Sequence, residues 1–142
     1  MTTAVTAPVP TGPQRSRPED PDDLGGAGCQ PPTLINVANE VRGTATEGTL
    51  YGLVFARLPL RVGQPVKIVW RMTGAADLAV VVRSPDDRTV PLVWGPESHG
   101  SSTYIRPGDE WGTGYLFDTP GCWHLHLQRS VASADVWLSV EP

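Results

Sequence analysis

Phe117-Asp118-Thr119-Pro120-Gly121-Cys122-Trp123-His124-Leu125-His126-Leu127, followed by Ala134-Asp135-Val136-Trp137-Leu138-Ser139-Val140, is the stretch that decides the fold. Apolar and polar residues alternate in both halves, and a period of two places successive side chains on opposite faces of a strand. One face of the first half carries Trp123, Leu125 and Leu127, and the other carries Cys122, His124, His126 and Gln128. The alternation predicts a closing β-hairpin that buries its apolar face and leaves Cys122 and the two histidines in solvent.

The register of this hairpin follows from a turn expected at residues 130–133. The inward pairs are then Leu127 with Val136, Leu125 with Leu138 and Trp123 with Val140, and the outward pairs are Gln128 with Asp135, His126 with Trp137 and His124 with Ser139. Every inward pair is apolar. A slip of one residue would send the apolar set into water, so the two faces are well specified.

Short apolar runs separated by turn signals continue upstream of the hairpin. Alternation at 66–72 and 78–82 predicts half-buried strands, Pro91 places a strand at 90–94 on a sheet edge, and 95–108 is expected to be a long loop. The strand that leads to the hairpin alternates Trp111, Thr113, Tyr115 and Phe117 with Gly112, Gly114 and Leu116. Seven or eight short strands without a helical period predict an antiparallel, immunoglobulin-like β-sandwich.

Composition narrows the class of protein. A chain of 142 residues has room for one domain with a self-sufficient core. The net charge of −4 and the scattered Lys and Arg argue against a nucleic-acid-binding surface, and no apolar run approaches the roughly 18 residues of a membrane-spanning helix. Residues 1–33 are rich in Pro, Thr, Asp, Gly and Arg, which predicts a flexible tail before a sandwich domain at 34–142.

Four stretches together resemble a group of uncharacterised bacterial envelope proteins, many of them lipoproteins. They are Lys67-Ile68-Val69-Trp70-Arg71-Met72, Trp94-Gly95-Pro96, Arg106-Pro107-Gly108-Asp109-Glu110-Trp111-Gly112 and Pro120-Gly121-Cys122-Trp123. In sequences of that kind a Pro-Gly-Cys-Trp step opens a late strand, and an earlier Cys often lies at the mature N-terminus. The resemblance covers residues 29–142 and implies a fold and a location at the cell envelope or outside the cell, more than an activity.

The region before Cys29 bears on export. Ala27-Gly28-Cys29 matches the small-small-Cys end of a bacterial lipoprotein cleavage site, although Gly26 stands where Leu is usual. The first 28 residues contain neither the basic cluster nor the apolar segment of about 7 to 15 residues that a secretory signal carries. The envelope location is therefore an expectation from the resemblance, with no export signal visible in this chain.

Cys29 and Cys122 are the two cysteines, and three alternatives stay open for them. A disulfide between them would stabilise the fold by about 2 to 4 kcal/mol and would need an oxidising compartment. Otherwise they are two free thiols, or a lipidated Cys29 beside an unpaired Cys122. They lack the paired spacing of a zinc site.

Three histidines raise the question of a metal. His124 and His126 share one side of a strand at a spacing that can chelate a transition metal, and His99 lies in the expected loop. Exposed polar residues on a solvated face are the simpler interpretation, because the sequence shows no groups that would orient the imidazoles. Neither a metal nor another cofactor is expected.

Trp94, Trp111 and Trp137 suggest a binding surface. If two of them stand on one face, they would form a stacking platform for sugar rings, because flat aromatics bury the apolar ring faces while polar neighbours satisfy the hydroxyls. The flanking polar groups would include Asp109, Glu110, His126 and Ser139. The alternative is that these tryptophans lie in the core or an interface, where the alternation already places Trp70 and Trp123.

The sequence shows no reaction machinery. Cys122 and His124 are close in sequence, but a nucleophile needs its base within hydrogen-bond reach and a third group that orients the base. The acidic pairs Asp86-Asp87 and Asp109-Glu110 are expected to form turns. We therefore expect no enzymatic activity. The sequence favours a non-catalytic envelope or extracellular domain that acts in protein interaction or as a structural module, and the alternative is a carbohydrate-binding module that uses exposed tryptophans.

Overall fold

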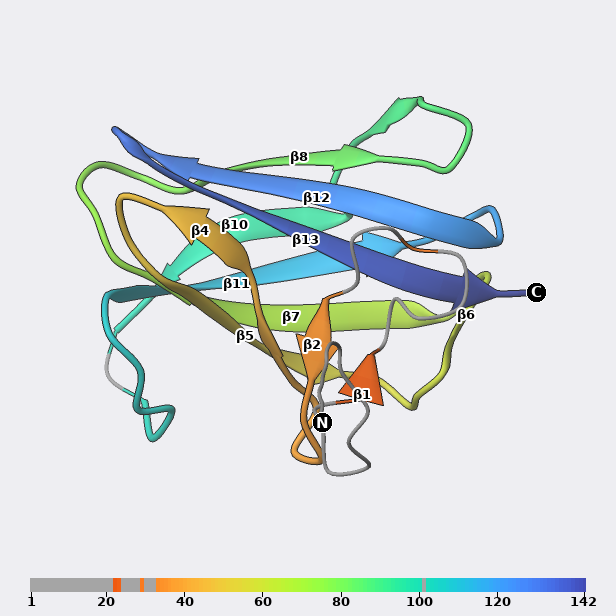
Figure 1. The fold of residues 1–142 in the computed structure, drawn as a ribbon, viewed down its shortest axis with the longest axis horizontal. Helices are drawn as coiled ribbons and strands as arrows, with labels where there is room; N and C mark the ends of the chain where they lie inside the picture. Colours follow the sequence, from red (N-terminus) through yellow and green to blue (C-terminus); the bar gives the residue numbers. More distant parts are fainter. Residues whose placement is uncertain (1–21, 24–28, 30–32, 101) are drawn as a thin grey trace, which may run out of the picture.

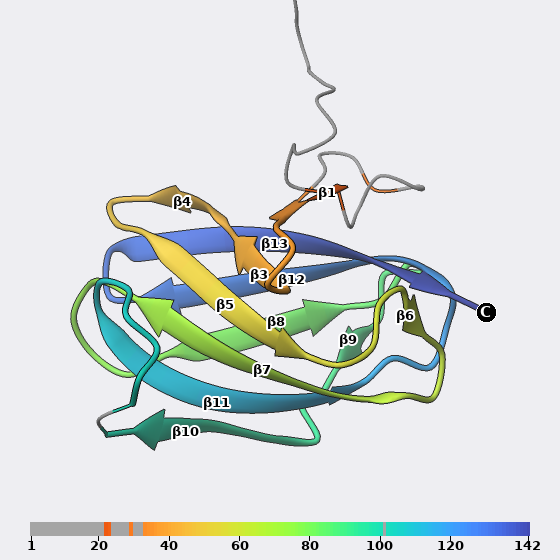
Figure 2. The same cartoon turned by 90° about the horizontal axis from the view of Figure 1, so that it is seen from below.

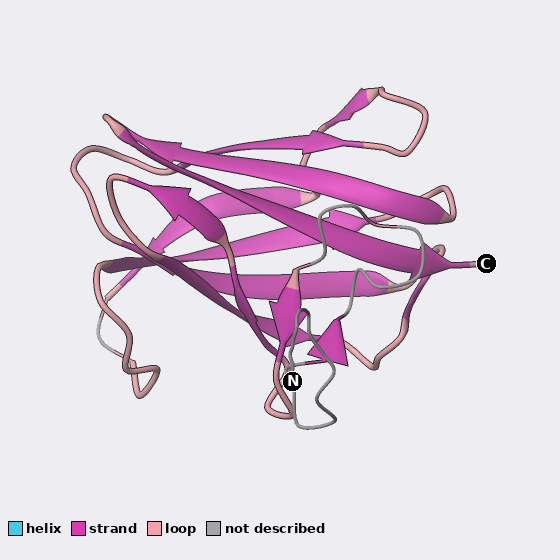
Figure 3. Ribbon diagram, viewed as in Figure 1, coloured by secondary structure: helices cyan, strands magenta, loops and turns pink. Residues whose placement is uncertain are grey.

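The computed structural model describes residues 22–23, 29, 33–100 and 102–142. These residues form strands, turns and loops without a helix (Figure 3), so none of them belongs to a helix that could cross a bilayer. The strands are β1 (Asp22–Asp23), β2 (Leu34–Ile35), β3 (Glu40–Arg42), β4 (Thr44–Thr46), β5 (Leu50–Phe55), β6 (Leu60–Arg61), β7 (Pro65–Met72), β8 (Ala79–Arg83), β9 (Thr89–Val90), β10 (Trp94–His99), β11 (Asp109–Leu116), β12 (Gly121–Arg129) and β13 (Ala132–Glu141).

Two sheets pack face to face. Sheet A has the strand order β1-β2-β3-β5-β7-β11-β10, and sheet B has the order β4-β13-β12-β8-β9. Figure 1 shows β8, β12 and β13 running above β11, β7 and β5, and Figure 2 shows β10 along the border of sheet A. All pairings are antiparallel except that of β6 with β13. The predicted antiparallel β-sandwich is confirmed.

The order of the main strands also matches the immunoglobulin-like arrangement. In chain order, β5, β7, β10 and β11 take the places of strands A, B, D and E, which form one sheet in the order A-B-E-D. The strands β8, β12 and β13 take the places of C, F and G in the other sheet, with β9 added beside β8. These eight strands agree with the expected number, although β10 lies in a segment that was predicted to be a loop, and β1 to β4 and β6 are short additions.

The space between the sheets is filled by the inward faces that alternation predicts. Trp70 of β7 and Trp123 of β12 are completely buried there, as expected. The Trp70 indole N–H lies 3.0 Å from Thr113 Oγ1 and 2.9 Å from the Tyr115 hydroxyl, so its polar atom is satisfied inside the core. Trp123 donates to the carbonyl oxygen of Thr119 at 2.8 Å.

The closing hairpin is present, but its register is shifted by two residues from the predicted one. Trp123 pairs with Leu138, Leu125 with Val136 and Leu127 with Ala134, and the chain turns at only two residues, Ser130 and Val131. Because side chains alternate with a period of two, this shift keeps every side chain on its predicted face. The outward pairs become Cys122 with Ser139, His124 with Trp137, and His126 with Asp135.

A buried arginine explains the shorter turn. Arg129, the residue just before the predicted turn, is the last inward residue of β12 and is only 5% exposed. Its guanidinium donates to the carbonyl oxygens of Ala76 and Met72 at 2.8 and 2.7 Å and pairs with Asp109 at 2.8 Å. These bonds compensate for the loss of hydration, so the hairpin extends by one more pair, Arg129 with Ala132.

Two other expectations concern loops. The long loop predicted at 95–108 is wrong in its first part, because β10 occupies Trp94–His99 and pairs with β11. Of the tail predicted at 1–33, residues 1–21, 24–28 and 30–32 lie outside the described residues. Cys29 and Thr33 are buried.

Candidate functional site

The two cysteines are joined in a disulfide, with their Cα atoms 5.1 Å apart. Cys29 is completely buried, and Cys122 lies on the outward face of β12 opposite Ser139. The bond therefore fastens Cys29 to the outer face of sheet B. A crosslink between residues 93 positions apart removes chain entropy from the unfolded state. With Sγ engaged in this bond, Cys29 has no thiol left to carry a lipid.

Trp137 lies beside this disulfide on the outer face of sheet B. Its ring stacks on the His124 imidazole, with the centroids 4.7 Å apart and the planes 3° from parallel. The backbone N–H of Trp137 donates to Thr33 Oγ1 at 2.7 Å. One face of the indole is therefore occupied by the His124 ring.

The Asp135 carboxylate contacts both histidines of β12. Its Oδ1 lies 2.7 Å from His124 Nε2 and 2.9 Å from His126 Nδ1. His126 Nε2 lies 3.3 Å from Gln128 Oε1, and the amide nitrogen of Gln128 donates to the carbonyl oxygen of Ser130, which directs its oxygen toward His126. Both ring nitrogens of His126 therefore face acceptors, and this arrangement favours the doubly protonated imidazolium.

The charges of this cluster agree with its hydrogen bonds. The hydrogen bond to Asp135 raises the pKa of His126. Partial burial opposes ionisation of Asp135, but the hydrogen bonds from His126 and His124 outweigh it and lower the pKa of the carboxyl. The cluster is thus an ion pair at mildly acidic pH.

The three candidate tryptophans lie in three different environments. Trp94 is on the outer face of sheet A, Trp137 is on the outer face of sheet B, and Trp111 points into the core, where it is 5% exposed. The Arg129 guanidinium lies 4.5 Å from the Trp111 ring centroid. No two of them share one face, so the sugar platform expected from a pair of these tryptophans is not formed. Of the three, Trp137 alone lies on the same sheet face as His126.

His99 lies on sheet A, far from the other histidines in the fold. Its Nδ1 lies 3.1 Å from Oε2 of Glu110, a buried residue of β11. The other carboxylate oxygen of Glu110, Oε1, lies 3.2 Å from Arg71 Nε. Ser102 Oγ donates to the same carboxylate at 2.5 Å. The hydroxyl thus meets a carboxylate and not an imidazole, so the cluster lacks the nucleophile–base contact of a hydrolase. Within the described ranges, no group of three His, Cys, Asp or Glu is arranged to hold a metal ion.

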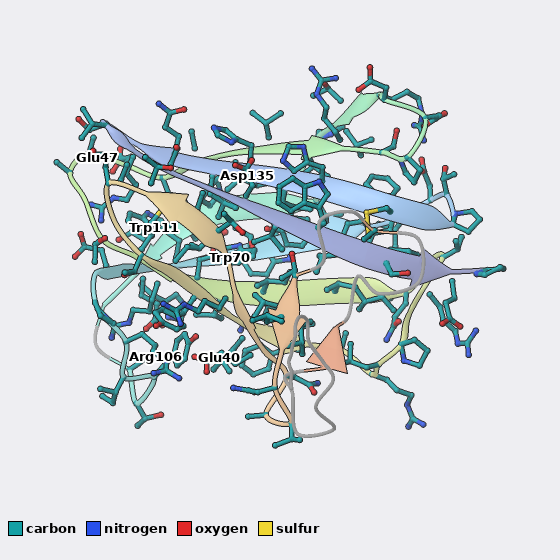
Figure 4. All side chains as sticks on the ribbon, viewed as in Figure 1. Glu40, Glu47, Trp70, Arg106, Trp111 and Asp135 are labelled. Atoms are coloured by element: carbon teal, nitrogen blue, oxygen red, sulfur yellow. A yellow bond between two sulfur atoms is a disulfide. The ribbon has the colours of Figure 1, made fainter. Side chains whose placement is uncertain are left out.

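A second buried carboxylate holds the loop before β11. Glu40 accepts two hydrogen bonds from the Arg106 guanidinium, both at 2.6 Å, and one from the Tyr104 hydroxyl at 2.8 Å. Figure 4 shows Glu40 and Arg106 next to each other. The bonds from Arg106 lower the pKa of Glu40 although burial opposes this. Glu40 and Glu110 together fasten residues 102–108 to one end of sheet A. This clamp could not be predicted from the sequence, because its members are up to 66 residues apart.

An apolar groove of about 280 Å³ occupies the other end of the outer face of sheet A. Its side chains come from β5, β7, β10, β11 and the residue before β10, and include Phe55, Pro65, Lys67, Val93, Trp94 and Leu116. Phe55, Trp94 and Leu116 are 53%, 36% and 46% exposed, which is unusual for large apolar side chains that lie together. We call this set the sheet A groove.

Two glycines form the floor on which Trp94 rests. A Cβ atom at Gly114 would lie 2.0 Å from Trp94 Nε1, and one at Gly112 would lie 3.2 Å from Cζ3. The indole therefore lies along β11, in space that any other residue at these positions would fill. Alternation in the sequence places Gly112 and Gly114 on the same face of their strand, but only the pairing of β10 with β11 shows that Trp94 lies over them.

Lys67 is the residue of the groove that sequence analysis missed, and one signal for it was available. It is the only lysine among 142 residues, and every other basic side chain except histidine is an arginine. Its ammonium lies 5.2 Å from the centroid of the Phe55 ring. A single amine thus stands among exposed apolar side chains.

Comparison of the chain with protein-family models, with curated proteins and with solved structures finds no match in any of the three.

Proposed function

We propose that this chain is a non-catalytic binding module of the cell envelope or extracellular space, and that it holds a protein partner in the sheet A groove. The observation that carries the proposal is the exposed cluster of Phe55, Trp94 and Leu116 on one sheet face. Contiguous exposed apolar side chains mark interaction surfaces, and each half-exposed large side chain contributes on the order of 1 kcal/mol when a partner completes its burial.

The chemistry of the groove favours a protein partner. Tryptophan and phenylalanine are the residues that dominate the energetics of protein interfaces, and here they lie close to one cation. Because Lys67 is positively charged, its complementary group on the partner would be a carboxylate. A partner that presents apolar side chains around an Asp or Glu would match both features.

The disulfide supports the proposed compartment. Disulfides form and persist in oxidising environments such as the periplasm and the extracellular space, and they are rare in the cytosol. The bond between Cys29 and Cys122 agrees with such a location. The resemblance of residues 29–142 to bacterial envelope proteins points the same way.

The buried polar groups support a non-catalytic role, because they hold the fold together. Glu40 is saturated by Arg106 and Tyr104, and Glu110 is shared by Arg71, His99 and Ser102.

A photo-crosslinking residue placed at position 116 tests the proposal in the producing cell. The matched control is the same residue at position 81, because Val81 is 42% exposed on sheet B and Leu116 is 46% exposed on sheet A. We expect one dominant protein adduct from position 116 that mass spectrometry identifies and that Trp94→Ala removes. Equal labelling from both positions, or none from position 116, contradicts the proposal.

Carbohydrate binding is the second candidate, and Trp94 is the observation that favours it. The indole rests on the glycine floor and remains 36% exposed, beside the polar side chains of Lys67 and Glu97. A glycan array probed with the wild type and with Trp94→Ala would decide: a sugar bound only by the wild type supports this function, and no bound sugar rules against it.

A further inference from the structure

Lys67 differs from two of the arginines on the same sheet face. Arg71 pairs with Glu110, and Arg106 pairs with Glu40, so these cations are neutralised within the molecule. Lys67 is exposed and forms no ion pair with any residue that the structure describes; its recorded contact is the Phe55 ring. The groove therefore presents one unneutralised cation.

Glu97 presents the matching anion on the same face. It is exposed on β10 and likewise forms no ion pair within the described ranges. The pairing of β10 with β11 is irregular between Trp94 and Glu97, and Glu97 is opposite Gly112 while Trp94 is opposite Gly114. This irregularity places residues three apart on the same face, which a regular strand would not do. Lys67 is opposite Gly114 from the other side, so the glycine floor separates the two charges.

We propose that the partner in the sheet A groove is a second copy of this chain, which rests on the proposed function. Two copies packed face to face bring Lys67 of each copy to Glu97 of the partner subunit when the twofold axis lies in the interface, crosses β11 between Gly112 and Gly114, and runs perpendicular to the line from Lys67 to Glu97. A twofold interface needs a self-complementary surface, and this one carries both charges on opposite sides of its centre. The apolar side chains Phe55, Trp94 and Leu116 fill the interface around the two ion pairs.

Analytical ultracentrifugation of the full chain provides the first test. We expect the average mass to rise with concentration toward twice 15.2 kDa, with a dissociation constant on the order of 10 µM for a small interface of this kind. Lys67→Glu and Glu97→Lys each bring like charges together twice per dimer, and each should weaken association by about 10-fold or more. The double variant Lys67→Glu/Glu97→Lys restores opposite charges and should recover most of the association.

Glu47→Lys is the matched control, because Glu47 is also exposed and forms no ion pair with a described residue, but lies in the turn between β4 and β5, outside the groove. It should associate like the wild type. A monomer at every concentration overturns the proposal, and so does a dimer that is insensitive to both single reversals.

Zero-length crosslinking tests the contact itself. A carbodiimide joins a carboxylate to an amine, and Lys67 offers the only side-chain amine in the chain. In a mixture of ¹⁵N-labelled and unlabelled protein, we expect a crosslinked peptide that joins Lys67 of one copy to Glu97 of the other. A crosslinked dimer that lacks this peptide contradicts the proposed geometry.

These outcomes separate the dimer from the wider proposal. If the protein is monomeric while position 116 crosslinks to a different protein, the second copy is wrong and the binding function stands. If the protein is monomeric and position 116 labels nothing, both proposals fall.

Discussion

The outer faces of the two sheets contrast sharply. On sheet B, the disulfide at Cys122, the shared carboxylate of Asp135 and the stacking of His124 on Trp137 satisfy the side chains from within the molecule. On sheet A, the clamp around Glu40 does the same at one end, but at the other end Phe55 stays 53% exposed, and Lys67 contacts its ring without forming an ion pair with any described residue. A face whose side chains are paired with one another contributes to stability, whereas a face that leaves apolar and charged side chains exposed is a candidate for binding.

Trp94 and Trp137 show this contrast within one residue type. Both lie on an outer sheet face, yet Trp137 has His124 parallel to its ring, while Trp94 has only glycines beneath it. The neighbours on adjacent strands, and not the residue type, decide which indole is available.

Loss of the disulfide should have the largest effect on stability. Because it closes a long loop, replacing both cysteines by serine should lower the free energy of unfolding by about 2 to 4 kcal/mol. Urea unfolding of Cys29→Ser/Cys122→Ser measures the difference, with the reduced wild type as control. The double variant should still associate through sheet A, and loss of association would show that the two faces are not independent.

Loss of the Glu40 clamp should have the next largest effect. Glu40→Ala leaves Arg106 and Tyr104 without their acceptor, which should cost about 1 to 3 kcal/mol. Glu97→Ala, on the same sheet, should change stability by less than about 0.5 kcal/mol because that carboxylate is exposed and unpaired. Hydrogen exchange should rise at residues 102–108 in the first variant alone, and equal protection in both would contradict the clamp.

These features were predictable from the sequence to different degrees. The sandwich and the two faces of the hairpin follow from alternation, which a two-residue shift in register does not disturb. The register was wrong because the turn was predicted at 130–133, and nothing local shows that the carbonyl groups of Met72 and Ala76 will hold Arg129 inside the fold at the end of β12. The sequence left the state of the two cysteines undecided, because a disulfide depends on where Cys29 lies in space.

The groove could not be predicted for a related reason. It depends on the pairing of β10 with β11, and Pro96 with the neighbouring glycines made that segment resemble a loop. Trp111 was treated as a surface candidate, although it belongs to the same alternating set as Tyr115 and lies in the core. Lys67 was predicted to be on the outward side of its strand, but its significance depends on Phe55 and Trp94 from other strands.

The glycine floor offers a smaller perturbation of sheet A. Gly114→Ala places a methyl group where the Trp94 indole now lies, so the ring should be displaced at a cost of about 1 kcal/mol. Iodide quenching of tryptophan fluorescence should increase and association should weaken. Gly100→Ala is the control, because no atom lies within 4 Å of its added Cβ. Unchanged quenching in Gly114→Ala would contradict the position of Trp94.

The smallest expected effect is a pH dependence that belongs to sheet B. The pKa of His126 is raised in the folded state, so its contribution to stability is present below pH 6.5 and is lost as the pH rises through the raised value. The pKa of Asp135 is lowered, so its contribution is present above pH 3.8 and is lost only at lower pH. The other titratable or charged groups that face this pair are His124 on β12 and Arg83 on β8.

Urea unfolding at pH 5.5 and pH 8 should therefore show the wild type more stable at the lower pH, and His126→Gln should reduce the difference. An unchanged difference in His126→Gln would assign the effect to another group.

Side-chain NMR compares the two faces in one sample. Reductive ¹³C-methylation keeps the charge of Lys67 and labels no other side chain, so its methyl signal reports on sheet A while the His126 ring proton reports on sheet B. Between about 10 µM and about 1 mM protein, a range that spans the affinity of a weak interface, the Lys67 signal should shift and broaden while the His126 signal stays fixed. A moving His126 signal beside a constant Lys67 signal would place the interface on sheet B and contradict the assignment of sheet A as the binding face.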